Sequence, residues 1–176
     1  MNLLFRLLLL RLRVRKAPAV SLWDQTETPF RVLPTDLDVL RHMNNGRYLT
    51  LLDLGRLDLM MRSGFGRIVS DHGWYSVVSA QTISYKRSLT LWQRFVVRTR
   101  VLGVDERSTY MEQEFVRGDT VVARAVIQAR FLRKTGGTIS GAEVLAVCPE
   151  PMPEDMVLPE WVTTWADEVR ISSSAS

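Results

Sequence analysis

The sequence predicts an α+β domain in which one long central helix is wrapped by a curled antiparallel sheet of about five strands. Residues 45–62 are apolar around most of a helix circumference, and a helix of this kind has to be surrounded by other structure. One short strand-like run precedes the helix, and four longer runs follow residue 74 with no helical pattern between them. A sheet built from these runs is large enough to enclose the helix.

The central helix has clear end signals. Asn44 or Asn45 is a good N-cap, because an asparagine side chain accepts a hydrogen bond from a backbone N–H that the helix leaves unpaired. Ser63-Gly64 supplies the φ-permissive residue that ends the helix. Gly55 at mid-span indicates close approach to another backbone. The apolar cover of the helix consists of Tyr48, Leu49, Leu51, Leu52, Leu54, Leu57, Leu59, Met60 and Met61.

The strands are predicted from the alternation of apolar and polar residues. After a connector at 17–28 we expect a short first strand at 29–33, and after the helix a loop at 65–73. The four later strands are expected at residues 75–86, 95–102, 110–116 and 121–131. Short turn-like connections between the last three predict an antiparallel meander. The odd-numbered residues of the last strand share one face, and the alanines among them leave room for a helix.

The chain divides into one domain and two extensions. These are residues 28–135 for the domain, 1–27 for an N-terminal segment with its connector, and 136–176 for a proline-rich C-terminal extension. The prolines of the extension argue against regular structure until a short helix at 161–170. We expect Trp161 and Trp165 to pack this helix onto the body, and residues 172–176 to be disordered.

Composition and charge exclude several classes of protein. With 176 residues, of which 46% are apolar, the chain is one ordinary globular domain. Five basic residues and no acidic residue lie among the first sixteen, so the formal net charge of +4 becomes −1 for the rest. A body without a basic face does not suit a nucleic-acid partner. One cysteine and two histidines provide neither an internal disulfide nor a metal cluster, which suits a reducing, cytoplasmic compartment and predicts no metal.

Residues 1–16 are apolar and basic, and their role stays open at this point. Arg6 and the basic residues from Arg11 onward interrupt the apolar run, whereas a membrane span needs about 20 consecutive apolar residues. A cleaved signal peptide has its charge before the apolar run, and here the order is reversed. As a helix the segment can lie peripherally on an anionic membrane surface, at the inner face. The alternatives are a frayed tail, or a helix that covers the domain or a subunit contact.

The stretch before the central helix carries the functional signal. Asp36-Leu-Asp38 followed by His42-Met-Asn-Asn-Gly-Arg-Tyr48 resembles the loop-helix motif of hotdog-fold thioesterases, in particular the 4-hydroxybenzoyl-CoA thioesterase-like group. Its His-x-Asn-Asn-x-x-Tyr portion is also similar to plant acyl-ACP thioesterases. The resemblance covers about residues 28–134. It implies a hotdog fold, acyl-CoA or acyl-ACP substrates, no metal or organic cofactor, and a homo-oligomer, at least a dimer, whose active sites lie between subunits.

The same resemblance implies roles for individual residues. Asp38 matches the catalytic carboxylate, and Asn45 matches the helix-start position whose backbone N–H polarises the thioester carbonyl. His42 matches the histidine of the acyl-ACP type. That type has an asparagine between the two, where this chain has Leu40, so the constellation of aspartate, asparagine and histidine is incomplete.

The chemistry of thioester hydrolysis supports the same roles independently. The reaction needs a nucleophile or a base for water, and a group that stabilises negative charge on the carbonyl oxygen. Asp38 supplies the first, and unpaired N–H groups of Asn45 and Gly46 at the positive end of a helix supply the second. Gly46 also lets a ligand approach the backbone closely. General-base catalysis is favoured slightly over direct attack by Asp38.

Other roles remain for the loop residues. Asp36 and Asp38 also fit ordinary turn positions before a helix. His42 can orient the turn through a hydrogen bond to a loop carbonyl instead of acting in catalysis. If His42 is the base, the protein is a hotdog dehydratase or hydratase. If neither residue acts, the protein is an acyl-binding, membrane-associated module without activity.

Three further residues are candidate substrate contacts. Tyr48 lies one turn into the helix, where packing against a sheet with its hydroxyl as a polar tip is the alternative. Lys86 and Arg87 end a predicted strand and suit the phosphates of a CoA nucleotide, although solvated strand ends have the same composition.

Overall fold

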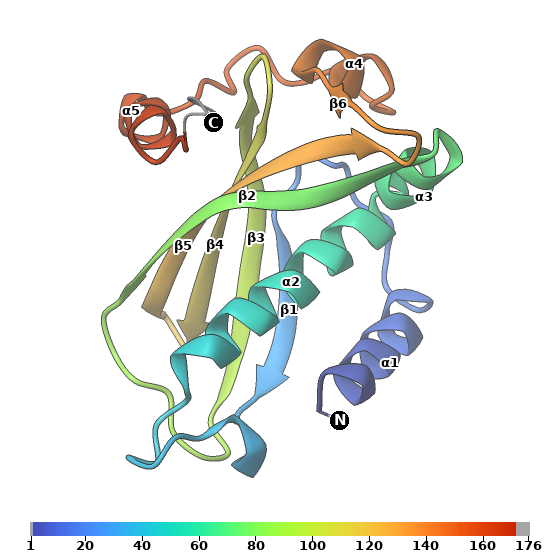
Figure 1. The fold of residues 1–176 in the computed structure, drawn as a ribbon. Helices are drawn as coiled ribbons and strands as arrows, with labels where there is room; N and C mark the ends of the chain where they lie inside the picture. The colour runs from blue at the N-terminus through green and yellow to red at the C-terminus, as the bar shows by residue number, and fades with distance from the viewer. Residues whose placement is uncertain (1, 172–176) are drawn as a thin grey trace.

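The computed structural model describes residues 2–171, which form a curled antiparallel sheet with a helix across its inner face (Figure 1). The central helix is α2 (Asn45–Arg62). The strands are β1 (Thr26–Arg31), β2 (Trp74–Tyr85), β3 (Arg94–Val104), β4 (Thr109–Arg117), β5 (Thr120–Arg133) and the two-residue β6 (Thr138–Ile139). The sheet order is β1-β3-β4-β5-β2, with β6 paired to β5. The predicted α+β fold class is confirmed.

The ends of α2 lie where the sequence predicts them. Asn44 is the N-cap, and its side chain accepts a hydrogen bond from the Gly46 N–H. The helix closes at Ser63, and Gly64 has a φ of 73°. Inside the curl of the sheet the helix buries a set of side chains that belong to the main core: Tyr48, Leu51, Leu52, Leu54 and Leu59.

Gly55 allows α2 to lie close to the sheet. A Cβ at this position would lie 2.8 Å from Gln113 Nε2 and 2.9 Å from Thr99 Oγ1. The expected neighbour was another backbone, and the structure corrects this, because the close atoms are side chains of β3 and β4. Gln113 is fully buried and donates to the Leu52 carbonyl and to Thr99 Oγ1. Moving its side chain away from position 55 would break these buried hydrogen bonds, which is energetically costly.

We therefore expect Gly55→Val to lower the free energy of unfolding by at least about 1–3 kcal/mol, the usual cost of overpacking a core. The measurement is urea unfolding, read as a shift in midpoint at constant slope. Leu57→Val is the matched control, since Leu57 is exposed on the same helix and its replacement should cost about 0.5 kcal/mol or less. Equal effects of the two substitutions would contradict this account of Gly55.

The four later strands and the meander of β3, β4 and β5 are confirmed, with ends within about two residues of those predicted. The odd-numbered residues of β5 from Ala123 to Phe131 are buried, as expected from their alternation. β1 begins at Thr26, three residues before the predicted start, in a stretch assigned to the connector. Thr26 and Thr28 are both buried, and threonine suits a strand as well as a connector.

Short helices are where the predictions fail. Residues 65–71 form helix α3 (Phe65–Asp71) and not a loop; Gly64 turns the chain, and Phe65 and Val69, one turn apart, are buried. In the extension, β6 and α4 (Gly141–Ala146) interrupt the stretch expected to lack regular structure.

The last helix, α5 (Glu160–Glu168), confirms the predicted short helix. Trp165 is half-buried and packs against the body together with the buried Val162 and Ala166, as expected for Trp165. The expectation for Trp161 is wrong, because its side chain is 51% exposed. The disorder predicted for residues 172–176 lies outside the described residues.

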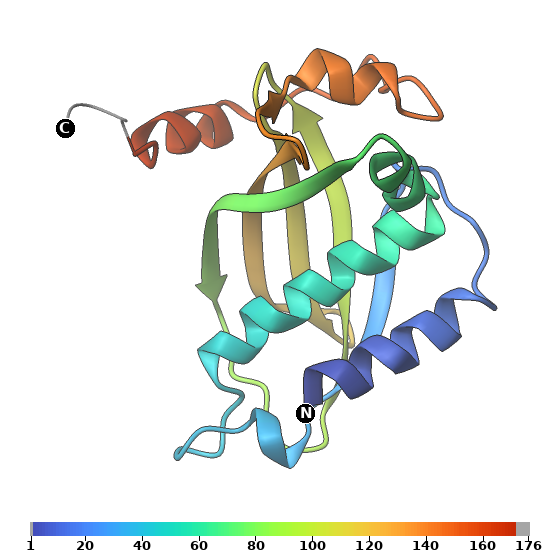
Figure 2. The same cartoon turned by 45° about the vertical axis from the view of Figure 1, so that its right-hand side comes forward.

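The N-terminal residues form helix α1 (Asn2–Val14), which lies alongside α2 on the side of β1 (Figure 2). Leu10 is buried in the main core. The Arg6 guanidinium donates to Asp36 Oδ2 at 2.5 Å, and Arg13 lies 3.5 Å from Asp58 Oδ2. Of the roles left open by the sequence, a helix that covers the domain is therefore correct for one face of α1. None of the helices within residues 2–171 has the length and apolarity needed to cross a membrane.

α1 also protects the outer edge of β1. Arg13 Nη2 donates to the Glu27 carbonyl at 2.7 Å, and Arg6 Nη2 donates to the Arg31 carbonyl at 3.1 Å. Pro29 lies midway between Glu27 and Arg31, so its backbone faces the same edge of the strand, and proline has no N–H to donate. Blocked carbonyls and an edge proline are common means of preventing a further strand from pairing. At the opposite end of the sheet, no strand among residues 2–171 pairs with the outer side of β2.

Candidate active site

The loop before α2 is a tight turn organised by Asp38. Leu37 and Met43 form a bridge across it, and the Asp38 N–H donates to the His42 carbonyl at 2.8 Å. The carboxylate oxygen Oδ1 of Asp38 accepts from the backbone N–H groups of Leu40, at 2.9 Å, and His42, at 3.1 Å. Asp38 is thus a turn residue, as the simpler alternative proposed. Within residues 2–171, however, its second oxygen, Oδ2, has no hydrogen-bond partner, so this half-buried carboxylate is fixed in place with one oxygen available.

The start of α2 offers one backbone donor and not two. The Gly46 N–H is occupied by Asn44 Oδ1 at 2.9 Å, which corrects the expectation that Asn45 and Gly46 both have unpaired N–H groups. The cap satisfies one orphan donor of the helix, as asparagine caps do. The Asn45 N–H has no hydrogen-bond partner among the described residues, and the residue is exposed. It stands at the positive end of an 18-residue helix, where an oxygen with developing negative charge is stabilised.

His42 points into solvent at the rim of the loop. Its side chain is exposed, and in the part of the chain that the structure describes its ring makes no hydrogen bond. The suggested contact between the ring and a loop carbonyl is therefore absent there. His42 holds the turn through its backbone, which also bridges to Thr90. No cluster of three or more metal-ligating side chains occurs within residues 2–171.

Tyr48 connects the first turn of α2 to the end of β2. Its ring packs edge-on against Tyr85, with centroids 5.0 Å apart, and against Phe115 at 4.8 Å. Its hydroxyl oxygen accepts from the Leu89 N–H at 3.3 Å. Burial raises the pKa of the Tyr48 phenol, so it stays neutral. The packing role with a polar tip is thus present, and Leu89 completes the connection by accepting from the Met43 N–H at 2.7 Å.

Lys86 and Arg87 follow β2 and line an open groove of about 890 Å³. Both side chains are exposed, and both backbone N–H groups donate to the Val122 carbonyl. Tyr85 belongs to the same groove, as does Trp161 of α5. Tyr85 also packs against Tyr48, so this one side chain contacts both the groove and the first turn of α2. The structure thus connects the two basic residues with the loop of Asp38 and the start of α2 through Tyr85 and Leu89.

Asp36 has a role that the sequence did not reveal. Its side chain is 2% exposed and accepts from Arg6 at 2.5 Å and from the Leu33 N–H at 2.8 Å. Its backbone carbonyl accepts from the N–H of the cap residue Asn44 at 2.8 Å. Burial lowers the pKa of Arg6, and the charge of Asp36 opposes this shift. Asp36 therefore links α1 to the start of α2, a connection that no local spacing in the sequence marks.

Known proteins similar to this chain share one family description. The sequence model of a family described as "Thioesterase-like superfamily" matches residues 32–165. The chain is 38% identical over 134 residues to Protein THEM6 of Xenopus laevis, an alignment that covers 76% of this chain and 63% of that protein. It is 41% identical over 100 residues to Protein THEM6 of Danio rerio, covering 57% of this chain and 50% of that protein. The chain thus spans between half and two thirds of the length of these relatives.

A solved structure shows the same arrangement of elements. The probable thioesterase YbaW of Escherichia coli superposes with a TM-score of 0.64 at 25% identity, covering 70% of this chain and 98% of that one. The superposition leaves about a third of the present chain without a counterpart.

Proposed function

The chain belongs to the thioesterase-like superfamily, and from this premise we propose that it hydrolyses acyl thioesters, with Asp38 as the base and the Asn45 N–H as the donor to the carbonyl oxygen. One observation carries the proposal. A carboxylate held by two backbone N–H groups, with its second oxygen available, lies in the loop that runs directly into the N-terminus of the buried helix α2. Acyl transfer requires a base and a hydrogen-bond donor for the carbonyl oxygen, and this loop and helix start carry both, seven positions apart in the sequence.

The reaction follows from the two groups. The thioester carbonyl oxygen lies against the Asn45 N–H, and Asp38 Oδ2 removes a proton from a water molecule that attacks the carbonyl carbon. The negative charge that develops on the oxygen is stabilised by the N–H and the positive helix end. When the C–S bond breaks, the proton held by Asp38 goes to the leaving thiolate, which gives one carboxylic acid and one thiol. Direct attack by Oδ2 gives the same products through a mixed anhydride, which water then hydrolyses. In a single turnover in ¹⁸O-water, label in Asp38 identifies direct attack followed by attack of water on the Asp38 carbonyl carbon, because general-base catalysis places the label only in the product acid.

The test of the activity is a panel of short, long and aromatic acyl-CoAs, with release of free thiol as the readout. We expect hydrolysis of at least one of them, and loss of this activity in Asp38→Asn. A trans-2-enoyl-CoA included in the panel separates thioesterase from hydratase. Formation of a 3-hydroxyacyl product that persists in Asp38→Asn and vanishes in His42→Ala would replace the proposal with hydration. Binding of acyl-CoA without turnover of any kind would replace it with an acyl-binding module.

We propose that the acyl group is carried by coenzyme A. The groove beside β2 would bind the nucleotide of this coenzyme. Lys86 and Arg87 are exposed on the groove wall, and Trp161, which is half exposed, lines the same space. Basic side chains and an aromatic ring suit the phosphates and the adenine of CoA. The segment that follows Arg87 contacts the loop of Asp38, because the Leu89 carbonyl accepts from the Met43 N–H. With the nucleotide of CoA in the groove, the thioester at the other end of CoA would lie at this loop.

Lys86→Ala combined with Arg87→Ala is expected to raise KM for an acyl-CoA about tenfold, the scale of one charged hydrogen-bonding contact. KM for the corresponding acyl-pantetheine, which lacks the nucleotide, should stay the same. Arg67→Ala combined with Arg107→Ala removes the same charge from exposed positions outside the groove and serves as the control. A rise in KM for both substrates, or for neither, would remove the two residues from nucleotide binding.

A dimer joined through β2 is part of the proposal. β2 is a 12-residue edge strand, and its apolar residues Tyr75 and Val78 are about two fifths exposed. A long open edge with exposed apolar side chains favours pairing with another strand, whereas the β1 edge is blocked by α1. Two copies paired through β2 would bring their sites, which adjoin Tyr85 at the end of this strand, to one interface.

Val78→Lys is expected to shift the protein from dimer to monomer, because like charges on paired edge strands repel and a lysine resists burial. Light scattering after size exclusion measures the molecular mass, and the acyl-CoA assay measures the activity, which should fall with the dimer. Val157→Lys is the control, since Val157 is an exposed valine in the C-terminal extension. A monomeric wild-type protein that hydrolyses acyl-CoA would overturn the dimer and leave the proposed chemistry in place.

A further inference from the structure

The outward face of α1 is apolar, which is the reverse of an ordinary surface helix. Leu4, Leu8 and Leu12 follow one another at four-residue spacing and are 50–73% exposed. The face toward the domain contains Arg6 and Arg13 together with the buried Leu10. A helix covering a domain normally turns its apolar stripe inward. The row of outward leucines therefore has no partner among the described residues and needs an explanation other than packing within the domain.

Polar contacts on the inner face prevent α1 from rolling to bury these leucines. Arg6 and Asp36 form a buried pair, and Arg13 both donates to the Glu27 carbonyl and lies 3.5 Å from the fully buried Asp58. Rolling the helix would separate these arginines from two buried carboxylates, and breaking a buried ion pair costs several kcal/mol. The apolar face is thus held outward by the fold.

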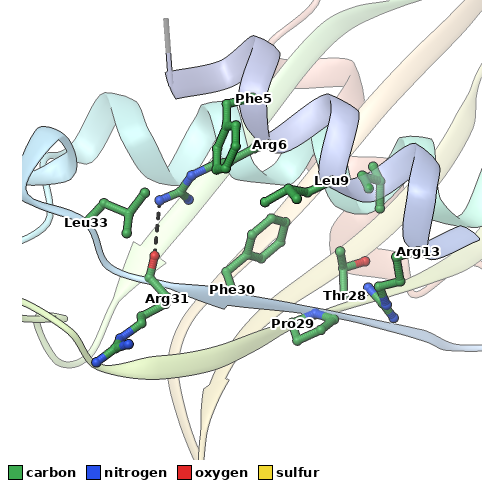
Figure 3. Close-up of a pocket in the computed structure, with 10 residues that line it drawn as sticks. Phe5, Arg6, Leu9, Arg13, Thr28, Pro29, Phe30, Arg31 and Leu33 are labelled. Atoms are coloured by element: carbon green, nitrogen blue, oxygen red, sulfur yellow. Dashed lines mark hydrogen bonds between the residues drawn. The ribbon is translucent and has the colours of Figure 1, made fainter.

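An apolar groove continues this face into the protein. It has a volume of about 220 Å³ and lies between α1 and β1, with Phe30 rising from the strand toward Arg6 and Leu9 (Figure 3). Phe5 and Leu9 line the groove and are also about half exposed, so they belong to both surfaces. The leucines and the groove form one connected apolar surface along the helix.

The charge around this surface is exclusively positive on the helix side. Arg11, Arg15 and Lys16 are exposed near the C-terminal end of α1, and residues 2–16 include no acidic side chain. Each basic residue near an anionic lipid surface contributes about 1 kcal/mol of attraction. We propose that the outward face of α1 is a docking surface for an anionic lipid bilayer, with the helix parallel to the membrane plane and the leucines in the headgroup and acyl boundary.

A second copy of the chain fits this surface less well. In a two-fold contact through α1 each helix would face cations of the other copy with no acidic side chain of its own within residues 2–16, so no ion pair between the helices would offset their charge. The proposed pairing through β2 lies at the opposite end of the sheet order from β1, beside which α1 lies. Both α1 faces of such a dimer stay accessible, and two of them on one bilayer would strengthen binding without new contacts.

The test is co-sedimentation of the full chain with vesicles of phosphatidylcholine, with and without a minority of phosphatidylglycerol. We expect binding to the anionic vesicles that weakens as salt rises. Arg11→Gln with Arg15→Gln should weaken it about 30-fold, the equivalent of about 2 kcal/mol. Leu8→Glu, and independently Leu4→Glu, should weaken it at least about tenfold through lost apolar burial and added negative charge.

The matched controls make the same types of substitution at exposed positions outside α1. Val157→Glu replaces an exposed valine, and Arg67→Gln with Arg107→Gln removes two exposed charges, so both proteins should bind as the wild type does. Thermal melts and hydrolysis of a soluble thioester show whether each variant is folded. Three results would overturn the proposal. They are a wild-type protein that stays in the supernatant with anionic vesicles, folded α1 variants that sediment normally, and a change in molecular mass of Leu8→Glu without lipid, which would assign the face to self-association.

Discussion

Asp38→Asn is expected to lower kcat for acyl-thioester hydrolysis at least about 10²-fold, the usual contribution of a positioned base. The substitution should change the chemistry of the carboxylate without changing the conformation of the loop. An asparagine oxygen can replace Oδ1 and accept from the Leu40 and His42 N–H groups as the carboxylate does, so the turn is preserved. Only the second oxygen, which has no protein partner within residues 2–171, loses its basicity. The free energy of unfolding should therefore change by less than about 1 kcal/mol.

The neighbouring aspartates are unequal controls. Asp53 is exposed on α2 and paired with Arg56, so Asp53→Asn should leave both activity and stability nearly unchanged. Asp36 fits an ordinary turn position in the sequence, but it is buried against Arg6, so Asp36→Asn tests stability first. Activity of Asp38→Asn within a few-fold of the wild type, in a folded protein, would leave Asp38 as a turn residue only.

Where the sequence repeats a pattern over many residues, the structure follows it. α2 has five turns of apolar positions and an asparagine cap, and β2 to β5 are nine to fourteen residues long and alternate over part of that length, so periodicity decides both type and position. Short helices cannot be predicted from periodicity. α3 has only seven residues and α4 six, too few for a helical period to emerge. α4 did have a readable signal, since Ser140 and Glu143 form a capping box that the surrounding prolines obscured.

In the candidate site, too, local features could be predicted from the sequence and contacts between distant residues could not. The loop of Asp38 and the cap of α2 are local in sequence, and both lie where the sequence puts them. The occupied Gly46 N–H could not be read, because it depends on which of two adjacent asparagines is the cap. The contact of Tyr48 with Tyr85 and the pairing of Asp36 with Arg6 join residues 37 and 30 positions apart, and such contacts come from tertiary packing that single-sequence patterns do not encode.

Arg6→Met is expected to lower the free energy of unfolding by about 3–5 kcal/mol, the usual cost of breaking a buried ion pair from one side. Methionine keeps much of the side-chain length and apolar contact but removes the Arg6 guanidinium from the buried Asp36 carboxylate. It also removes a donor to the Arg31 carbonyl on the edge of β1. Deleting α1 altogether should be worse, since Arg13 and Leu10 are lost as well and the β1 edge becomes open to aggregation.

The measurement is urea unfolding of a double-mutant cycle at positions 6 and 36. Asp36→Asn alone should also destabilise the protein, and Arg6→Met with Asp36→Asn should cost less than the two single changes combined, because no unpaired charge stays buried. Arg11→Met is the control on the exposed face of the same helix and should cost about 0.5 kcal/mol or less. If Arg6→Met is as mild as Arg11→Met, α1 does not hold the loop of Asp36 in solution. The outward apolar face would then belong to a helix free to roll, and its leucines would need no membrane to cover them.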